Sequence, residues 1–177
     1  MSALCLALSS NASASLIDAQ QVAINYDVSD EQLSSKGSHA AFTKAMAEAK
    51  QAIDEETKGW QEKYSEIESS DNPIQYFHAG NVAQLESTDL IVRGNEMMLR
   101  VQVEELFSKF GEKIPSEVAL SIRQLRISVA KLRMSITNVM DMEKQLRPAI
   151  SADKASFTMT PDALESMKAA TKNAYFH

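Results

Sequence analysis

SIRQLRI, SVAKLRM, SITNVMD and MEKQLRP follow one another from Ser121 to Pro148 and repeat one order of apolar and polar residues every seven positions. The two apolar positions of the repeat, a and d, are occupied by Val118, Ile122, Leu125, Val129, Leu132, Ile136, Val139 and Leu146. Four successive repeats in phase predict one long coiled-coil helix with a continuous apolar seam. We expect this helix to cover 116–147 and to stop at Pro148, because proline disrupts a helix interior.

The seam must face another helix. At roughly 2 kcal/mol for each buried side chain, its eight residues represent about 16 kcal/mol of apolar burial. That sum exceeds the net stability of a typical domain, about 5–15 kcal/mol, so a seam open to water would be very unfavourable. Glu143 occupies an a position, where it either pairs with a basic group across the seam or marks fraying near Pro148.

The residues before this helix supply its partner. A second helix is predicted over 81–110, with Asn81 and Gln84 in the spacing of a capping box and Gly111 as the C-terminal cap. Its clearest seam consists of Leu99, Val103, Leu106 and Phe110. Since 111–115 is a short connection, the two helices are expected to form an antiparallel hairpin.

An acidic helix is predicted from Ser38 to Ser69, before the hairpin. Its apolar residues recur in steps of three and four, while its other faces are rich in glutamate. Thr160 and Pro161 indicate a short last helix near 161–173. We therefore predict an all-α fold, a long helical hairpin with flanking helices in a three- to four-helix bundle. The predicted division is 1–37, a flexible or targeting segment; 38–147, the helical domain; and 148–177, a linker with a short helix.

A second apolar line runs along the heptad helix. Leu120, Ile127 and Met134 recur at position f, almost opposite the seam, where a surface helix is ordinarily polar. The basic residues that flank this line include Arg123, Arg126 and Arg133. Either the acidic helix at 38–69 covers the line within the chain, or the line is a contact surface for another protein.

Trp60 and Tyr64 belong to the one local concentration of aromatic residues. Two roles are open for them. They pack inside the bundle, or they anchor a partner protein, because aromatic residues are enriched at binding hot spots.

The charge is unevenly distributed. Residues 1–92 contain 14 acidic and 5 basic groups (net −9), and 93–147 contain 7 acidic and 10 basic groups (net +3), within a chain of net charge −6. This asymmetry suggests that an acidic segment lies against a basic one, within a chain or between chains, although two separately solvated surfaces fit equally well. The overall negative charge disfavours nucleic acid as the main partner.

The first 17 residues contain no charged side chain and many serines and alanines. Three interpretations remain: a cleavable export signal, a leader of the kind read by bacterial type III secretion, or a tail that includes a docking helix over 15–25. The location of the protein, cytoplasmic or exported, is therefore open.

Residues suited to catalysis or metal binding are widely separated. The histidines His39, His78 and His177 do not share a ligand spacing, and Cys5 stands alone. No glycine-rich phosphate loop is present, and no apolar run is long enough to cross a membrane. We expect no cofactor, no metal and no enzymatic activity.

These observations predict a non-enzymatic structural or interaction protein that assembles through helices, as a homo-oligomer or with a helical partner. Its most concrete form is an exported filament, tip or translocator-type component of a bacterial secretion apparatus. The alternatives are a cytoplasmic chaperone or adaptor that covers a partner's helix, and a nucleic-acid-binding regulator that uses the arginines of 123–133.

Overall fold

The computed structural model describes residues 8–24 and 36–156, and within these ranges every regular element is a helix. The elements are α1 (Ser10–Ile24), α2 (Lys36–Glu68), the short 3-10 helix η1 (Pro73–Tyr76), α3 (Ala79–Phe110), the 3-10 turn η2 (Gly111–Lys113) and α4 (Ser116–Ser156). The chain divides into two units, Met1–Glu143 and Lys144–His177. The predicted all-α class is confirmed.

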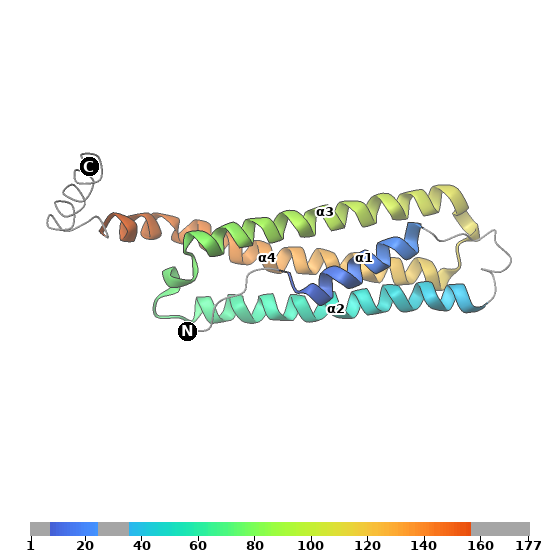
Figure 1. Cartoon of the computed structure of the whole chain (residues 1–177), viewed down its shortest axis with the longest axis horizontal. Coiled ribbons are helices and arrows are strands. Elements are labelled where there is room, and N and C mark those ends of the chain that lie inside the picture. The colour runs from blue at the N-terminus through green and yellow to red at the C-terminus, as the bar shows by residue number, and fades with distance from the viewer. Residues whose placement is uncertain (1–7, 25–35, 157–177) are drawn as a thin grey trace, which may run out of the picture. The chain divides into compact units, whose positions relative to one another are not determined.

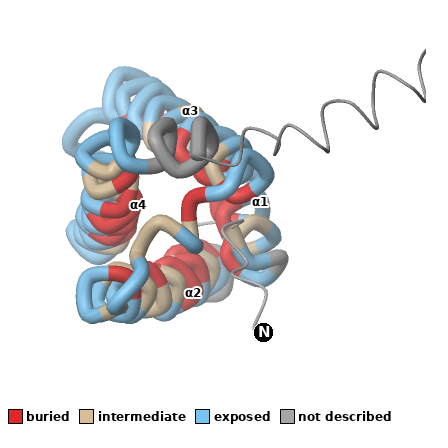
Figure 2. Tube along the Cα trace, turned by 90° about the vertical axis from the view of Figure 1, so that its left-hand side faces the viewer, coloured by how far each residue is buried: buried red, intermediate tan, exposed pale blue. Residues whose placement is uncertain are grey.

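The first unit is a helical bundle. α3 runs opposite to α2 and α4, and α1 runs in the direction of α3 (Figure 1). Seen along the helices, α1 and α4 lie on opposite sides of a common interior, and the buried residues lie on the sides of the helices that face it (Figure 2). The turn at η2 joins α3 to α4 as the antiparallel hairpin that the sequence predicts.

The heptad seam of α4 lies in this interior. Its residues in the first unit, each at most 3% exposed, are Val118, Ile122, Leu125, Val129, Leu132, Ile136 and Val139. Glu143, at the next a position, is also buried, with 6% exposure, so the seam does not fray there. The seam fixes the rotation of α4 about its own axis, since turning the helix would expose these side chains to water.

In the second unit, α4 does not stop at Pro148 as expected but continues to Ser156. Proline has no backbone N–H and so cannot donate to the carbonyl four residues earlier in a helix. Pro148 lies on an exposed part of α4, where a helix can accommodate the missing hydrogen bond. The predicted helix at 161–173 lies outside the described residues.

Both ends of α3 are set by short-range contacts. The N-cap is His78, whose Nδ1 accepts a hydrogen bond from the backbone N–H of Asn81 at 3.4 Å. The capping box predicted at Asn81 is therefore wrong, because the Asn81 side chain instead donates to the carbonyl of Tyr76 at 2.9 Å. Gly111 ends the helix with φ 53°, as predicted, in the left-handed region that glycine tolerates best.

α2 follows the predicted acidic helix closely, beginning at Lys36 rather than at Ser38. It continues without a break through Gly59. Its buried apolar side chains are those of Phe42, Met46, Ala49, Ala52, Ile53, Trp60 and Ile67. The period of three and four in the sequence therefore identified its inner face.

Small residues bring α1 close to its neighbours. Its buried side chains are Ala12, Leu16, Ala19 and Ala23, and alanines also lie buried on α2. Backbone Cα atoms of α1 come within 8 Å of both α2 and α3, because alanines leave little between the helix axes. Hydrogen bonds from Ser9 N to Glu56 Oε2 (3.2 Å) and from Gln20 Nε2 to Asn95 Oδ1 (2.9 Å) join α1 to α2 and α3 respectively.

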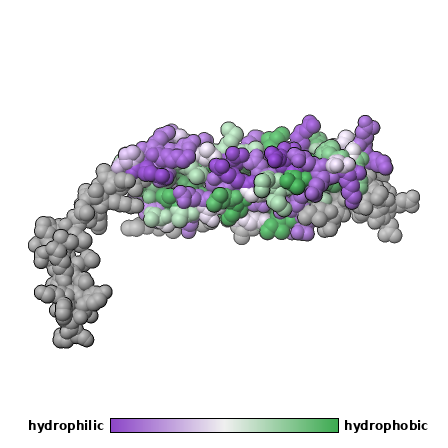
Figure 3. Space-filling view, turned by 90° about the horizontal axis from the view of Figure 1, so that it is seen from above, coloured by the Kyte–Doolittle hydropathy of each residue, from purple (hydrophilic) through white to green (hydrophobic). Residues whose placement is uncertain are grey.

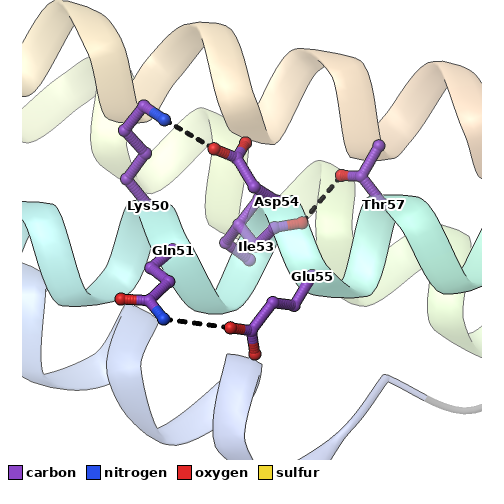
Figure 4. Close-up of polar contacts among 6 residues, drawn as sticks. All are labelled: Lys50, Gln51, Ile53, Asp54, Glu55 and Thr57. Atoms are coloured by element: carbon purple, nitrogen blue, oxygen red, sulfur yellow. Dashed lines mark hydrogen bonds and ion pairs between the residues drawn. The ribbon is translucent and has the colours of Figure 1, made fainter.

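A polar contact links α2 to α4 on the other side. Asp54 points toward α4 and accepts from Lys50, one turn earlier on α2 (Figure 4). Partial burial raises the pKa of Asp54, but hydrogen bonds from Lys50 and from Ser128 of α4, with the charges of Lys50 and Lys131, outweigh it and leave the pKa below its usual value. The ionised carboxylate is therefore favoured by the folded state.

The two apolar lines of α4 predict different losses of stability for the same leucine-to-alanine substitution. Leu132→Ala at a fully buried d position should lower the free energy of unfolding by about 2–5 kcal/mol, because it leaves a cavity. Leu120→Ala at position f should change it by less than about 0.5 kcal/mol, since that side chain is half exposed. Urea denaturation followed by circular dichroism measures both, and equal losses would contradict the observed rotation of α4.

Asp54→Asn should destabilise the protein at neutral pH by less than about 1 kcal/mol, because the carboxylate is partly exposed and screened. The pKa of Asp54 in the folded state lies below the usual 3.8. The stabilisation by its carboxylate is therefore complete above pH 3.8 and is lost as the pH falls through the folded pKa. Urea unfolding of both proteins across this acidic range should show the difference shrinking. A difference that stays constant with pH would contradict the assignment.

Candidate interaction groove between α3 and α4

A groove of about 540 Å³ lies between α3 and α4 on the outside of the bundle. It is lined by Arg93, Glu96, Met97 and Arg100 from α3 and by Arg123, Arg126, Ile127, Ala130 and Arg133 from α4. On α3, the first and last of these residues are seven positions apart and share one side of the helix. The lining thus combines five guanidinium groups and one carboxylate with the apolar side chains of Met97, Ile127 and Ala130.

Three of the arginines are held by acidic residues of the bundle. Arg93 Nε lies 2.7 Å from Asp89 Oδ2, Arg133 Nη1 lies 2.9 Å from Glu96 Oε2, and Arg100 Nε lies 3.7 Å from Glu104 Oε1. The Arg133–Glu96 pair connects α4 to α3 directly. Within the described ranges Arg123 and Arg126 form no ion pair, so the uncompensated positive charge of the groove lies on α4.

Asp89 is the acidic partner that holds Arg93. Its side chain is only 8% exposed, and its Oδ1 atom is buried without a hydrogen-bond partner in the part of the chain that the structure describes. A buried carboxylate is stabilised by an adjacent cation, and here that cation is Arg93. The contact holds the guanidinium group of Arg93 in the lining of the groove.

The apolar line predicted at position f is exposed, with Leu120 at 53%, Ile127 at 50% and Met134 at 67%. Coverage of this line by the acidic helix, one of the two alternatives drawn from the sequence, is therefore wrong. The physical reason is the rotation of α4, whose buried seam turns position f away from the interior. For the same reason Arg123, Arg126 and Arg133 line a groove with α3 rather than facing α2.

α3 has an exposed apolar line of its own, which the sequence analysis missed. Leu90 and Met97, seven residues apart, are 70% and 58% exposed, and Val101 is exposed one turn beyond Met97. The other exposed large apolar side chains of α3 are Ile91, Met98 and Phe107. Because α3 and α4 are antiparallel and Glu96 pairs with Arg133, Leu90 lies on the Met134 side of that ion pair and Val101 lies on the Ile127 side. A count of apolar residues on α3 could have found this line, since the helix contains more apolar residues than a single buried face requires.

We call the set Leu90, Met97, Val101, Leu120, Ile127 and Met134 the outer face of α3 and α4. Figure 3 views the bundle from the α3 side and shows hydrophobic side chains at the surface among hydrophilic ones. Its apolar lines run along both helices, with the arginines of the groove between and beside them. Scattered apolar residues are normal on a protein surface, but an ordered line on each of two neighbouring helices is typical of a contact site.

Trp60 and Tyr64 lie on α2, away from the groove. Trp60 is fully buried and its Nε1 donates to Glu56 at 2.9 Å, so packing is the role that the structure shows for it. Tyr64 is half-buried and its hydroxyl donates to Glu68 at 3.4 Å. The two aromatic residues are therefore not brought together with the predicted arginines.

Across 8–24 and 36–156, no group of three His, Cys, Asp or Glu side chains is arranged to hold a metal ion. None of the helices described by the structure contains an apolar stretch that could cross a membrane. Comparisons with protein-family models, curated proteins and solved structures found no match to this chain.

Arginine substitutions should separate the side chains that stabilise the bundle from those that do not. Arg123→Ala with Arg126→Ala should leave the free energy of unfolding within about 0.5 kcal/mol of the parent, because neither side chain has an ion-pair partner in the described bundle. Arg93→Ala should cost about 1–3 kcal/mol, because it leaves the Asp89 carboxylate buried without its cation. Thermal and urea unfolding measure both, and an equal cost would contradict the division.

Proposed function

We propose that this chain is a non-enzymatic interaction protein, a helical bundle that presents the outer face of α3 and α4 to a helix of another protein subunit. The single observation that carries the proposal is the pair of exposed apolar lines on adjacent helices. Both lines repeat every seven residues, through Leu90 and Met97 on α3 and through Leu120, Ile127 and Met134 on α4. A helix laid along the groove would meet side chains at this spacing, which is the geometry of coiled-coil packing.

The free energy gained by burying the apolar side chains of the outer face limits the affinity of the complex. Each half-exposed side chain of the outer face would contribute about 1 kcal/mol on burial, or roughly 6 kcal/mol for six residues. Association costs about 4–15 kcal/mol in lost translational and rotational freedom. Apolar contact alone therefore supports only a weak complex, and the groove arginines must add directed interactions for stable assembly.

Two forms of assembly are consistent with this surface. In the first, the chain is a structural component of a larger assembly, such as an exported filament, tip or translocator. In the second, it is a chaperone or adaptor that covers a partner's helix. The uncharged leader suggested export, but part of it forms α1, with Ala12, Leu16, Ala19 and Ala23 buried in the bundle. The interaction proposal does not depend on export, which detection of the chain in culture medium would test.

The experiment compares three forms of the full chain isolated from the cells that make it: the parent, an Ile127→Asp and Met134→Asp variant, and a control with Ala47→Asp and Gln61→Asp. Both control positions are exposed on α2 and receive the same added charge. Light scattering after size exclusion should give a mass above the 19.5 kDa monomer for the parent and the control. The outer-face variant should elute as a folded monomer, because two carboxylates oppose burial of the lines.

Three results would contradict the proposal. The parent could elute as a monomer, the outer-face variant could retain the complex, or that variant could lose its helical circular dichroism signal. The last result would assign Ile127 and Met134 to the stability of the bundle instead of to its contacts. The control distinguishes a local effect from a general effect of added negative charge.

A further inference from the structure

The charge of the groove indicates what kind of helix it binds, an inference that rests on the proposed interaction function. The lining contains five arginines and one glutamate. Arginine presents a planar fork of donors that matches a carboxylate with two parallel hydrogen bonds. An occupant that buries this groove must supply carboxylates, since desolvated guanidinium groups without partners would weaken the complex.

The spacing of the arginines agrees with a helical occupant. Arg93 and Arg100 are seven residues apart along α3, and Arg126 and Arg133 are seven apart along α4. Seven residues are two helical turns, about 10.5 Å of rise. Both rows line the groove together with Met97 and Ile127. A helix with an apolar stripe and acidic residues every second turn beside that stripe matches this lining.

A second copy of the chain matches the groove between α3 and α4 poorly. If two copies met through the same face, their apolar lines would touch, but Arg123 and Arg126 of each copy would be buried together with like charges. If one copy offered α2, its glutamates would meet the arginines, but the described part of α2 has no exposed large apolar side chain to cover the lines. Residues 157–177 contain equal numbers of acidic and basic residues, which gives them no acidic surplus.

We propose that the groove between α3 and α4 binds an acidic amphipathic helix of a different protein. Its apolar stripe lies on Met97 and Ile127, and its carboxylates pair first with Arg123 and Arg126, whose charges are uncompensated. Arg93, Arg100 and Arg133 already have acidic neighbours and complete the basic lining of the groove. The charge pattern selects the partner, and the apolar lines hold it.

Two synthetic helical peptides of about four heptads test this inference. They share a Leu/Ile stripe at a and d and differ only at e and g, which are glutamate in one and lysine in the other. Fluorescence anisotropy with the full chain at moderate salt measures each affinity. We expect the glutamate peptide to bind at least about tenfold more tightly than the lysine peptide, because only its carboxylates complement the groove.

Charge reversal provides the decisive comparison. Arg123→Glu with Arg126→Glu should weaken the glutamate peptide by about tenfold or more and strengthen the lysine peptide. The control, Lys44→Glu with Lys58→Glu, makes the same change in net charge on exposed positions of α2 and should alter neither affinity. Circular dichroism confirms that each variant is folded before the titration.

Other outcomes would overturn the inference in distinguishable ways. Equal binding of both peptides, abolished by Ile127→Asp with Met134→Asp, would support the outer face as a docking site and reject the selection for acidic partners. Absence of binding by either peptide would reject the acidic-helix inference, while the light-scattering experiment separately decides the proposed function. Tight binding of a DNA duplex that the Arg123 and Arg126 reversal removes would assign the groove to nucleic acid instead.

Discussion

Burial of the α4 seam is the constraint on which the rest of the structure depends. The apolar side chains from Val118 to Val139 all face the interior of the first unit, and this fixes the rotation of a long helix. Once a and d are turned inward, position f must point to water, and the arginines must lie at the side of the helix that borders α3. The exposed line and the charged groove are thus consequences of the same packing that stabilises the bundle.

The groove also needs α3 to lie in register with α4. The turn at Gly111 sets that register from one end, and the pair of Arg133 with Glu96 joins the helices farther along. On α3 the buried Asp89 positions Arg93, so part of the electrostatics of the groove is anchored in the interior. Because the groove lies on two helices of a packed bundle, its arginine rows keep their spacing without support from a flexible loop.

Sequence reasoning succeeded where the decisive information is periodic and failed where it depends on which helices become neighbours. The heptads predicted the buried face of α4, and Gly111 predicted the hairpin, because both signals are local. The charge asymmetry pointed to contact between the acidic helix and the arginines, but net charge does not specify which side of a helix meets its neighbour. Arg93 and Arg100 were missed because their role arises only when α3 lies beside α4. Pro148 misled because a solvent-exposed turn can tolerate a proline.

The alanine contacts of α1 have a consequence for how the molecule opens. A buried alanine removes much less apolar surface from water than a buried leucine, so α1 is held by a smaller free energy than α4. Separation of α1 from the bundle does not require the α4 seam to leave the interior. Amide hydrogens of Ser10–Ile24 should therefore exchange with solvent through a partial opening, while those of the central turns of α4 exchange only when the whole bundle unfolds. The packing of α1 through alanines therefore predicts one weakly held helix beside three helices that unfold together.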